Sequence, residues 1–510
     1  MIVKKREGLL FRDFIRKEKA LVSIIAISVI VCWGQNAFTN NVRIDGEVFI
    51  NNPGTLQGWL SVGRFGMLPV KYLLGNLNFN PYFSGAVFIV LFSAVCILWA
   101  YLITSIIPDL RYLWVFAILY VSSNTWAYMF YFTMMSAEIA FALLIIAVSL
   151  IVFTKQDISR SLNMEVPRVI CILLLIIAFG CYQAIVPVFI SGAAICILLW
   201  LNREADAGKE LSFKAYFAHS LRYIAPFAAA FILYSLIAGI WFTSGDYLTG
   251  MSMWQSHSFL TCLIIIAGRI GQTLGGSPNL YSFAFPVGCF LCLGVYLKEF
   301  RKNKLKHNLP LYEFTCFVLL LSPFIILIRL GGQMIPRMQF SLQLVSAFMC
   351  MYALNKIDRK YIRAAAAAAS VAVVLFQFSV VERLYYTDDI REKQDEALAF
   401  EICSDIGDEY SDSGLPVVFV GRKDAKLNNA CLKTDVFGAS LFSWDYNSDI
   451  PSLGSHRSAG FIKALTGIDY PEPSEEQKIM ACVLAKEMPS YPQEGYIAEK
   501  DGILIVKLSD

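Results

Sequence analysis

Long apolar segments recur along this chain of 510 residues and constrain its fold more than any other feature. A helix needs about 20 consecutive apolar residues to cross the roughly 30 Å hydrocarbon layer of a bilayer. Windows of that kind fall around residues 20–38, 83–104, 112–131, 137–154, 168–184, 185–201, 223–242, 280–297, 311–329, 338–354 and 362–381. We therefore expect a polytopic α-helical membrane protein with about eleven transmembrane helices.

Two stretches do not fit a simple series of spans. Residues 168–201 are too long for one helix, and the pair Tyr182 and Gln183 predicts a break between two antiparallel spans. The weaker segment 259–276 is interrupted by Arg269 and by two glycines near its end. We expect it to form an in-plane or re-entrant helix rather than a crossing.

Composition supports a membrane protein and excludes several other classes. The chain is 57% hydrophobic and 16% charged, with a mean hydropathy of +0.56, outside the balance of a water-soluble domain. A net charge of +3 is too small to indicate nucleic acid as a partner. Most of the 13 cysteines lie in apolar segments, and the 4 histidines are widely scattered. We expect no disulfide framework, no metal and no cofactor.

Basic residues predict the orientation, because Lys and Arg are retained on the cytoplasmic side. They are concentrated in residues 4–19, 298–306 and 356–363, whereas the intervening loops carry few. The N-terminus should therefore be cytoplasmic, and an odd number of spans places the C-terminus outside. No small-residue cleavage site follows the first apolar run, so we expect that helix to be retained.

The composition changes after about residue 384, where charged residues become frequent and apolar runs shorten to strand length. We expect a membrane domain of residues 1–383 and a small soluble α/β domain of residues 384–510 on the extracytoplasmic side. The patterns in this domain predict a strand at Val417–Val420, a helix at Ser474–Lys486 and a hairpin at Tyr496–Leu508 that turns at Lys500-Asp501-Gly502.

The first loop that we place outside, residues 39–82, holds the most polar chemistry near the membrane. Asp45 and Glu47 lie just beyond the first helix. An amphipathic segment further along carries Gln57, Trp59, Arg64 and Lys71. Acidic and basic side chains are therefore expected to meet at the membrane surface.

Transfer of a sugar from a prenyl phosphate would use both kinds of group. A carboxylate takes the proton of the acceptor hydroxyl, and a cation stabilises the leaving phosphate. Asp45, with Glu47 in reserve, is the candidate base, and Arg64 is the candidate phosphate ligand. The alternatives are that the carboxylates are solvated loop surface and that Arg64 anchors the loop by reaching the interface.

Other polar residues lie at helix ends on the same side. Tyr182 and Gln183 either form a hydrogen-bonded helix break or contact sugar or phosphate. Arg329 and Arg337 either reach towards the interface or bind phosphate. Glu138 lies within a span, where an ionised side chain costs about 2.5–3.5 kcal/mol if it faces lipid. We expect Glu138 to face a polar cavity or to be paired.

Several short motifs occur in a fixed order along the chain: Asp45-Gly46-Glu47, the W-x-x-x-G-R-F-G run from Trp59 to Gly66, Tyr182-Gln183, Pro336-Arg337, and Met488-Pro489-x-Tyr491-Pro492 with a closing strand from Ile503 to Val506. In these motifs and their order the chain resembles the serotype-converting type II glucosyltransferases of bacterial surface polysaccharides, multispan enzymes of the GT-C architectural class. Phe65 stands where that family often has Trp.

The resemblance implies a GT-C-like glucosyltransferase of the bacterial inner membrane with an acidic catalytic residue in the first outer loop. The implied donor is a polyprenyl-phosphate-linked glucose, and the implied acceptor is the O-antigen or another cell-wall glycan. A glucosyltransferase that makes the donor and a flippase that carries it across are the implied partners. One carboxylate cluster with no second nucleophile predicts inversion.

Two other functions are compatible with many spans and interfacial charges. A flippase or transporter predicts charges across the membrane and internal repeats, and the sequence shows neither. A glycan polymerase or ligase of similar topology stays open. The sugar, its linkage and the acceptor are not specified by the sequence.

Overall fold

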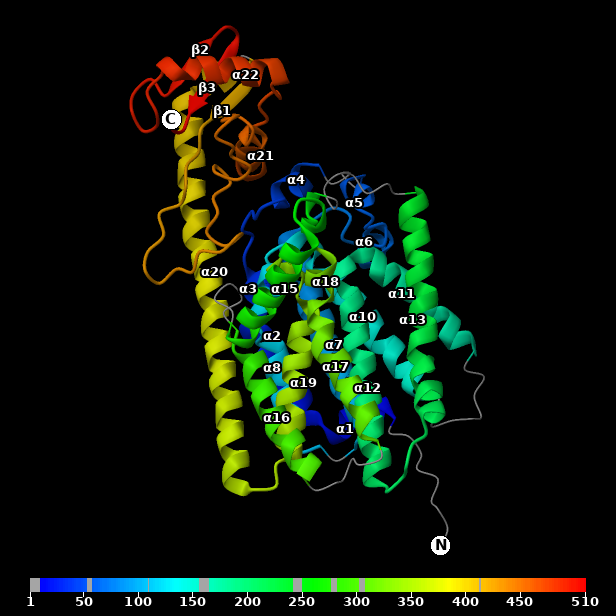
Figure 1. Cartoon of the computed structure of the whole chain (residues 1–510). Coiled ribbons are helices and arrows are strands. Elements are labelled where there is room, and N and C mark those ends of the chain that lie inside the picture. Colours follow the sequence, from blue (N-terminus) through cyan, green and yellow to red (C-terminus); the bar gives the residue numbers. More distant parts are fainter. Residues whose placement is uncertain are drawn as a thin grey trace.

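The computed structural model describes residues 10–52, 57–108, 110–155, 165–241, 250–276, 282–301, 308–411 and 414–510. An upright bundle of helices carries a small sheet above one end (Figure 1). The first described helix, α1 (Phe11–Lys17), lies at the other end of the bundle. We call the end that carries the sheet the upper end.

Apolar periodicity and length account for the helices of the bundle. In chain order they are α2 (Lys19–Trp33), α7 (Pro81–Ile106), α8 (Leu113–Val121), η1 (Asn124–Trp126), α9 (Ala127–Phe130), α10 (Thr133–Thr154), α11 (Glu165–Cys181), η3 (Gln183–Ile185), α12 (Val186–Asp206), α13 (Phe213–Trp241), α15 (Phe259–Leu274), α16 (Ala284–Arg301), α17 (Leu309–Leu321), η5 (Ser322–Phe324), α18 (Ile325–Arg329), α19 (Phe340–Lys356) and α20 (Lys360–Ser411). The remaining elements of this part are short: α3 (Gln35–Phe38), α4 (Gly46–Asn51), α5 (Gln57–Ser61), α6 (Met67–Leu74), η4 (Met253–Gln255) and η6 (Pro336–Met338). Of these, α4, α5 and α6 lie at the upper end of the bundle (Figure 1).

Six helical stretches within the described residues are long and apolar enough to cross a bilayer: Pro81–Ile106, Thr133–Thr154, Gln183–Asp206, Phe213–Trp241, Leu309–Arg329 and Lys360–Gly407. They differ in burial, because α12 is almost wholly surrounded by other helices whereas α13 presents side chains such as Leu236 and Ile240 to the outside. Apolar surface of this extent is typical of a membrane protein. The other predicted windows fall on shorter or interrupted helices, so the number of eleven crossings stays a prediction.

The window 112–131 does not form one helix. It is divided into α8, η1 and α9 at a polar segment that begins at Ser122. The Ser122 hydroxyl donates to the Gln377 side chain at 3.0 Å, and the Trp126 indole donates to the Tyr120 carbonyl at 2.9 Å. Irregular backbone is tolerated here because the segment is buried in protein rather than exposed to lipid.

The predicted break at Tyr182 is confirmed. Helix α11 ends at Cys181, Tyr182 has an extended conformation with φ of −160°, and a short 3-10 helix then leads into α12. The segment 259–276 forms a single helix, α15, which is shorter than the six candidate spans. Its expected in-plane or re-entrant placement stays a prediction.

Helix α20 is 52 residues long and runs along the side of the bundle up to the sheet (Figure 1). It passes the expected domain boundary at residues 383 and 384 as continuous helix, and the first non-helical residue inside it is Gly407, with φ of 69°. The charged residues that begin near 384 do not all face solvent, because Asp388, Arg391 and Asp395 are buried. The composition change therefore marks a polar interface on one face of a helix.

The C-terminal domain has the predicted α/β elements. Strands β1 (Val417–Val420), β2 (Ile497–Lys500) and β3 (Ile503–Lys507) form a sheet in the order β1-β3-β2, with β1 parallel and β2 antiparallel to β3. Asp501 and Gly502 both have positive φ, as a tight hairpin turn requires. Helices α21 (Ser455–Thr466) and α22 (Glu475–Leu484) accompany the sheet, and Ser474 forms a capping box with Gln477.

Candidate functional site

The Asp-Gly-Glu motif lies at the start of α4, at the upper end of the bundle. Asp45 precedes the helix in the left-handed conformation, with φ of 67°. Non-glycine residues rarely adopt this conformation, and they are enriched at functional sites. The Asp45 side chain is 40% exposed, whereas the Glu47 side chain is 1% exposed. The two carboxylates are therefore close in sequence but differ in access to solvent.

Arg457 of α21 contacts both carboxylates. Its Nη1 lies 3.0 Å from Asp45 Oδ1 and 2.6 Å from Glu47 Oε1, and its Nε donates to Asp445 Oδ2 at 2.8 Å. Burial raises the pKa of Glu47 to about 7, although Arg457 opposes the shift. The second Glu47 oxygen is buried without a hydrogen-bond partner in the described part of the chain. Glu47 is thus poised to change charge near neutral pH.

Helix α20 holds the segment just before this motif. Arg43 Nε donates to Asp388 Oδ2 at 2.7 Å, and both side chains are buried. Glu392 accepts from the Val42 amide at 2.7 Å, and Arg391 donates to the Val42 carbonyl at 3.2 Å. Because buried charges are costly unless they are paired and hydrogen-bonded, these contacts fix the loop in one position. Elements α20 and α21 therefore position Asp45 and Glu47 from two sides.

A series of aromatic contacts leads from α4 to the arginine of the first loop. Phe49 stacks on Trp59 with ring centroids 5.2 Å apart. The Arg64 guanidinium lies 5.7 Å from the Trp59 ring and 4.5 Å from the Tyr182 ring. Tyr182 in turn stacks on Phe340. Cation–π contacts of this kind orient a guanidinium without neutralising its charge.

The glycines beside Arg64 explain how this loop reaches the bundle. Gly63 has φ of 72°, which favours glycine. The Gly66 amide donates to the Gly180 carbonyl at 2.9 Å, and a Cβ at Gly66 would lie only 2.1 Å from the Ile177 carbonyl oxygen. Because these glycines lack a side chain, the backbone of the loop packs closely against the end of α11, and Arg64 lies over the Tyr182 ring.

Arg64 is 9% exposed and has no carboxylate partner within the residues that the structure describes. Its Nε and the Trp59 Nε1 are buried without a hydrogen-bond partner in that part of the chain. The Gln183 side chain donates to the Val62 carbonyl at 2.9 Å, and the Tyr234 hydroxyl of α13 lies within electrostatic range of both Arg64 and Arg329. The structure thus brings together two cations, an amide and a phenol, an arrangement suited to an anion.

Lys71 and Glu138 lie deeper in the bundle and neutralise each other. Lys71 Nζ is 3.0 Å from Glu138 Oε1, and Asn76 donates to the same oxygen at 2.7 Å. Both charged side chains are almost completely buried, at 2% and 0% exposed. The expectation that Glu138 is paired is confirmed. Lys71 also approaches the Phe49 ring at 6.0 Å, so this pair adjoins the aromatic series.

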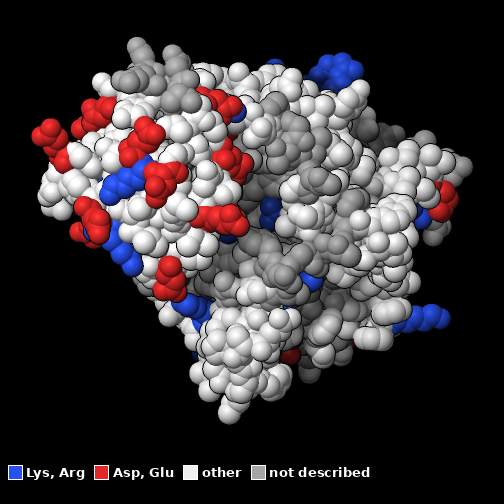
Figure 2. Space-filling view, turned by 90° about the horizontal axis from the view of Figure 1, so that it is seen from above, with Lys and Arg blue, Asp and Glu red and all other residues white. Residues whose placement is uncertain are grey.

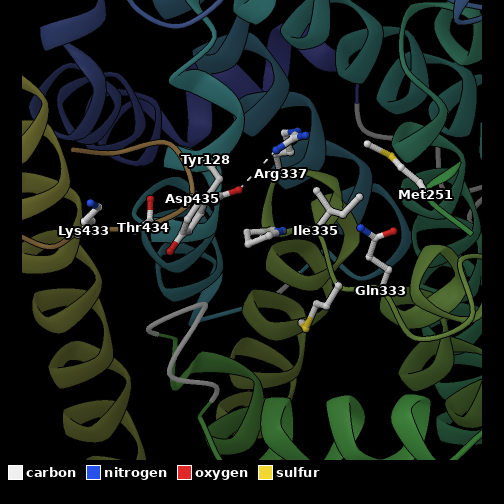
Figure 3. A pocket seen from close by; sticks show the side chains of 10 residues that line it. Tyr128, Met251, Gln333, Ile335, Arg337, Lys433, Thr434 and Asp435 are labelled. Atoms are coloured by element: carbon white, nitrogen blue, oxygen red, sulfur yellow. Dashed lines mark hydrogen bonds and ion pairs between the residues drawn. The ribbon is translucent and has the colours of Figure 1, made fainter. Parts of the chain in front are cut away.

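Arg337 lies apart from Arg64, at a pocket beneath the C-terminal domain. Its Nη1 is 3.4 Å from Asp435 Oδ2, and its guanidinium lies 5.7 Å from the Phe132 ring (Figure 3). A view onto the upper end shows acidic side chains gathered over the C-terminal domain, beside a hollow with basic side chains at its floor (Figure 2). The upper end therefore combines a hollow with charges of both signs.

Gln57 and His257 are two further polar residues outside the membrane-spanning helices. Gln57 begins α5, but its side chain lies outside the described residues. His257 lies in a turn, where its Nδ1 hydrogen-bonds the neighbouring Ser256 hydroxyl. In the described ranges no group of three or more His, Cys, Asp or Glu side chains is arranged to hold a metal ion.

A family model described as glucosyl transferase GtrII matches residues 36–354, which is more than half of the chain. The chain belongs to this glucosyltransferase family. Neither the curated proteins nor the solved structures contain a match. The matched region of this GtrII-family chain includes the acidic motif, Arg64, Arg329 and Arg337, but it ends before α20 and the C-terminal domain.

Several contacts of the glucosyltransferase were not predicted from its sequence. Asp388, Arg391 and Asp395 have the i, i+3 and i+7 spacing that places charges on one helix face, and this signal indicates a polar interface. Arg457, in contrast, lies 410 residues from Glu47, and no local pattern marks it. Tyr234 likewise lies in an apolar helix without a motif.

Proposed function

We propose that this membrane glucosyltransferase transfers glucose from a polyprenyl-phosphate-linked donor to a bacterial surface glycan, either the O-antigen or another cell-wall polymer. Transfer occurs on the extracytoplasmic face and inverts the anomeric centre. The observation that carries the proposal is a series of ring contacts, Phe49 on Trp59 and Trp59 on Arg64, that links helix α4 to a buried guanidinium without a carboxylate partner in the described chain. Asp45 and Glu47, held by Arg457, lie at the start of α4.

The donor phosphate occupies the position beside Arg64. A guanidinium offers a planar fork of donors that matches phosphate oxygens, and Tyr182 and Trp59 hold it in place through their ring faces. Arg329 and the Tyr234 hydroxyl supply further favourable contacts. These groups lie at the upper end of apolar helices, where a lipid tail can extend along the bundle while its headgroup stays at the surface.

Asp45 is the proposed general base, because its exposed carboxylate can contact an acceptor hydroxyl directly. Glu47 is buried and acts as a positioning residue, since its negative charge holds Arg457 beside Asp45. The pKa of Glu47 near 7 makes this arrangement depend on pH. Glu47 becomes the base if the test on Asp45 fails.

The chemical step is a single displacement. The acceptor oxygen attacks the anomeric carbon while its proton passes to the Asp45 carboxylate. The bond between the anomeric carbon and the donor phosphate oxygen breaks, and its electron pair leaves with the phosphate. Arg64 stabilises the charge that develops there. One displacement inverts the configuration, because no enzyme-linked glucose is formed.

The remaining proposals concern the cellular setting. The N-terminus is cytoplasmic, and the C-terminal domain with the upper end of the bundle faces outward from the inner membrane. The partners are the donor lipid, the surface glycan and the bilayer, together with a glucosyltransferase that makes the donor and a flippase that delivers it. The separation of α1 from the sheet supports opposite locations for the two ends.

A reconstituted reaction tests the proposal. The full-length protein in lipid nanodiscs is given polyprenyl-phosphate-glucose and purified surface polysaccharide, and NMR records the anomeric configuration of glucose in the product. Inverted product from the lipid donor, with none from a nucleotide-linked glucose, is expected. Retained configuration would contradict the single displacement, and equal transfer from the nucleotide sugar would contradict the lipid donor.

A further inference from the structure

A second polar pocket lies between the membrane part and the C-terminal domain. It has a volume of about 480 Å³, within the range of about 300–1,000 Å³ that is common for small-molecule sites. One wall comes from the segment 333–337, which ends in η6, and the opposite wall comes from residues 433–435 (Figure 3). These two walls belong to different parts of the chain, so the pocket exists only where the C-terminal domain meets the bundle.

Basic side chains outnumber acidic side chains in the lining of this pocket. Arg337 and Asp435 form an ion pair across it at 3.4 Å. Lys433 also lines the pocket, and no ion pair to it is found among the described residues. The lining therefore carries one net positive charge. An anionic group in the ligand would satisfy Lys433 and could also approach Arg337.

The uncharged residues of the lining fall into an apolar group and a polar group. Met251, Met334, Ile335 and Pro336 provide an apolar surface, and Gln333, Thr434 and Tyr128 provide polar groups. A sugar ring presents both an apolar C–H face and hydroxyl groups at its edge, so it matches this division. Lipid tails would offer no charge to the Lys433 ammonium, so a polar ligand fits this lining better.

Side-chain contacts connect the pocket to the loop that carries Asp45. The Arg337 guanidinium lies over Phe132, whose neighbour Tyr131 accepts a hydrogen bond from Arg43 at 3.5 Å through its backbone carbonyl. Arg43 precedes Asp45 in the same loop. A polymer that occupies the pocket can thus extend towards the Asp45 carboxylate.

We propose that the pocket formed by Arg337, Lys433 and Asp435 binds an acidic sugar unit of the acceptor glycan and so selects the polymer that is glucosylated. This inference rests on the proposed function. It adds a substrate class, a glycan with a carboxylate-bearing sugar, and assigns its recognition to a contact between the C-terminal domain and the bundle.

Binding of small probes tests the pocket without requiring catalysis. Methyl glucuronide and methyl glucoside are titrated against the full-length protein in nanodiscs, and their affinities are compared by ligand-observed NMR. The glucuronide should bind more tightly than the glucoside. Lys433→Gln should weaken binding of the glucuronide about tenfold, corresponding to about 1.4 kcal/mol. Lys486→Gln, which removes an exposed charge elsewhere in the same domain, is the matched control and should leave binding unchanged.

Steady-state kinetics with the surface polysaccharide provide the second measurement. Lys433→Gln should raise the KM for the acceptor about tenfold and leave kcat and the donor KM unchanged. Equal binding of the two probes, or no effect of Lys433→Gln on either measurement, would overturn the inference. Displacement of the glucuronide by an equal concentration of inorganic phosphate would also overturn it, because the pocket would then be a general anion site.

The two proposals fail separately. Absence of glucose transfer by the wild-type protein would contradict the proposed function. Normal transfer with an unchanged acceptor KM in Lys433→Gln would leave that function intact and remove the pocket from acceptor recognition.

Discussion

Two cationic regions of the same first loop differ in how their charges are compensated. Lys71 is paired with Glu138 at 3.0 Å, and Asn76 supports the pair. Arg64 lies against the faces of Trp59 and Tyr182, and the described chain offers it no carboxylate. Both cations are buried, so burial alone does not separate them.

The difference teaches how to distinguish a buried charge that stabilises the fold from one that is available to a ligand. A paired charge has its interaction satisfied within the protein, and removal of one partner exposes a large desolvation cost. An arginine held by aromatic faces keeps its hydrogen-bond donors free for an anion. We therefore expect substitutions near Arg64 to lower activity and substitutions at Lys71 to lower stability.

The largest loss of glucose transfer is expected from substitution of Asp45, the proposed general base. Asp45→Asn keeps the size of the side chain, but the amide cannot take the proton from the hydroxyl of the acceptor glycan. Glucose transfer should therefore fall by about 10²–10⁴-fold. The protein should remain at its normal level in the membrane, measured by immunoblot. Near wild-type transfer would move the assignment to Glu47, for which Glu47→Gln is the corresponding test.

Disruption of the Lys71 pair should mainly affect folding. Lys71→Met leaves Glu138 buried without its cation and should lower the free energy of unfolding by about 3–5 kcal/mol, measured by thermal unfolding of the purified protein. Combining Lys71→Met with Glu138→Gln removes both charges and should restore most of the lost free energy of unfolding. A stable double variant that lacks activity would instead show that the pair takes part in transfer.

Arg64→Lys tests whether the geometry of the guanidinium matters. Lysine keeps the charge but loses the planar fork, so kcat should fall about tenfold while the donor KM changes less. Arg203→Lys, at an exposed helix end where Arg203 pairs with Glu204, is a matched control and should keep normal kinetics. An Arg64→Lys enzyme with unchanged kcat would indicate that Arg64 only anchors the loop.

The pH dependence of transfer should reflect Glu47. Because its pKa is raised to about 7, Glu47 ionises as the pH rises through that value, and kcat/KM should increase over the same interval. Arg457 favours the ionised form, so Arg457→Gln should move this rise to higher pH. In Glu47→Gln the rise near pH 7 should disappear, and its persistence there would assign it to another group.

The smallest effect is expected from removal of metal ions. The proposed mechanism uses Arg64 and Arg329 to stabilise the leaving phosphate, so EDTA should leave the rate of glucose transfer unchanged. Loss of activity in EDTA with recovery on addition of magnesium or manganese would show that these cations are not sufficient.

The local features of the fold were predictable because each depends on a short range of sequence. The break at Tyr182, the β1 strand and the turn at Asp501 and Gly502 all occur where their patterns indicate. The segment 112–131 was predicted wrongly as one helix, because hydropathy does not reveal that protein buries Ser122 and lets the backbone break there.

The sequence by itself determined that the chain needs a membrane, that acidic residues follow its first helix and that a small α/β domain ends it. Only the tertiary structure decided that Arg457 holds Asp45 and Glu47, that Lys71 is neutralised by Glu138 and that Lys433 meets Arg337 at one pocket. Periodicity and turn chemistry act between neighbours in the chain. Charge pairing acts through space, so its partners become visible only when distant segments pack together.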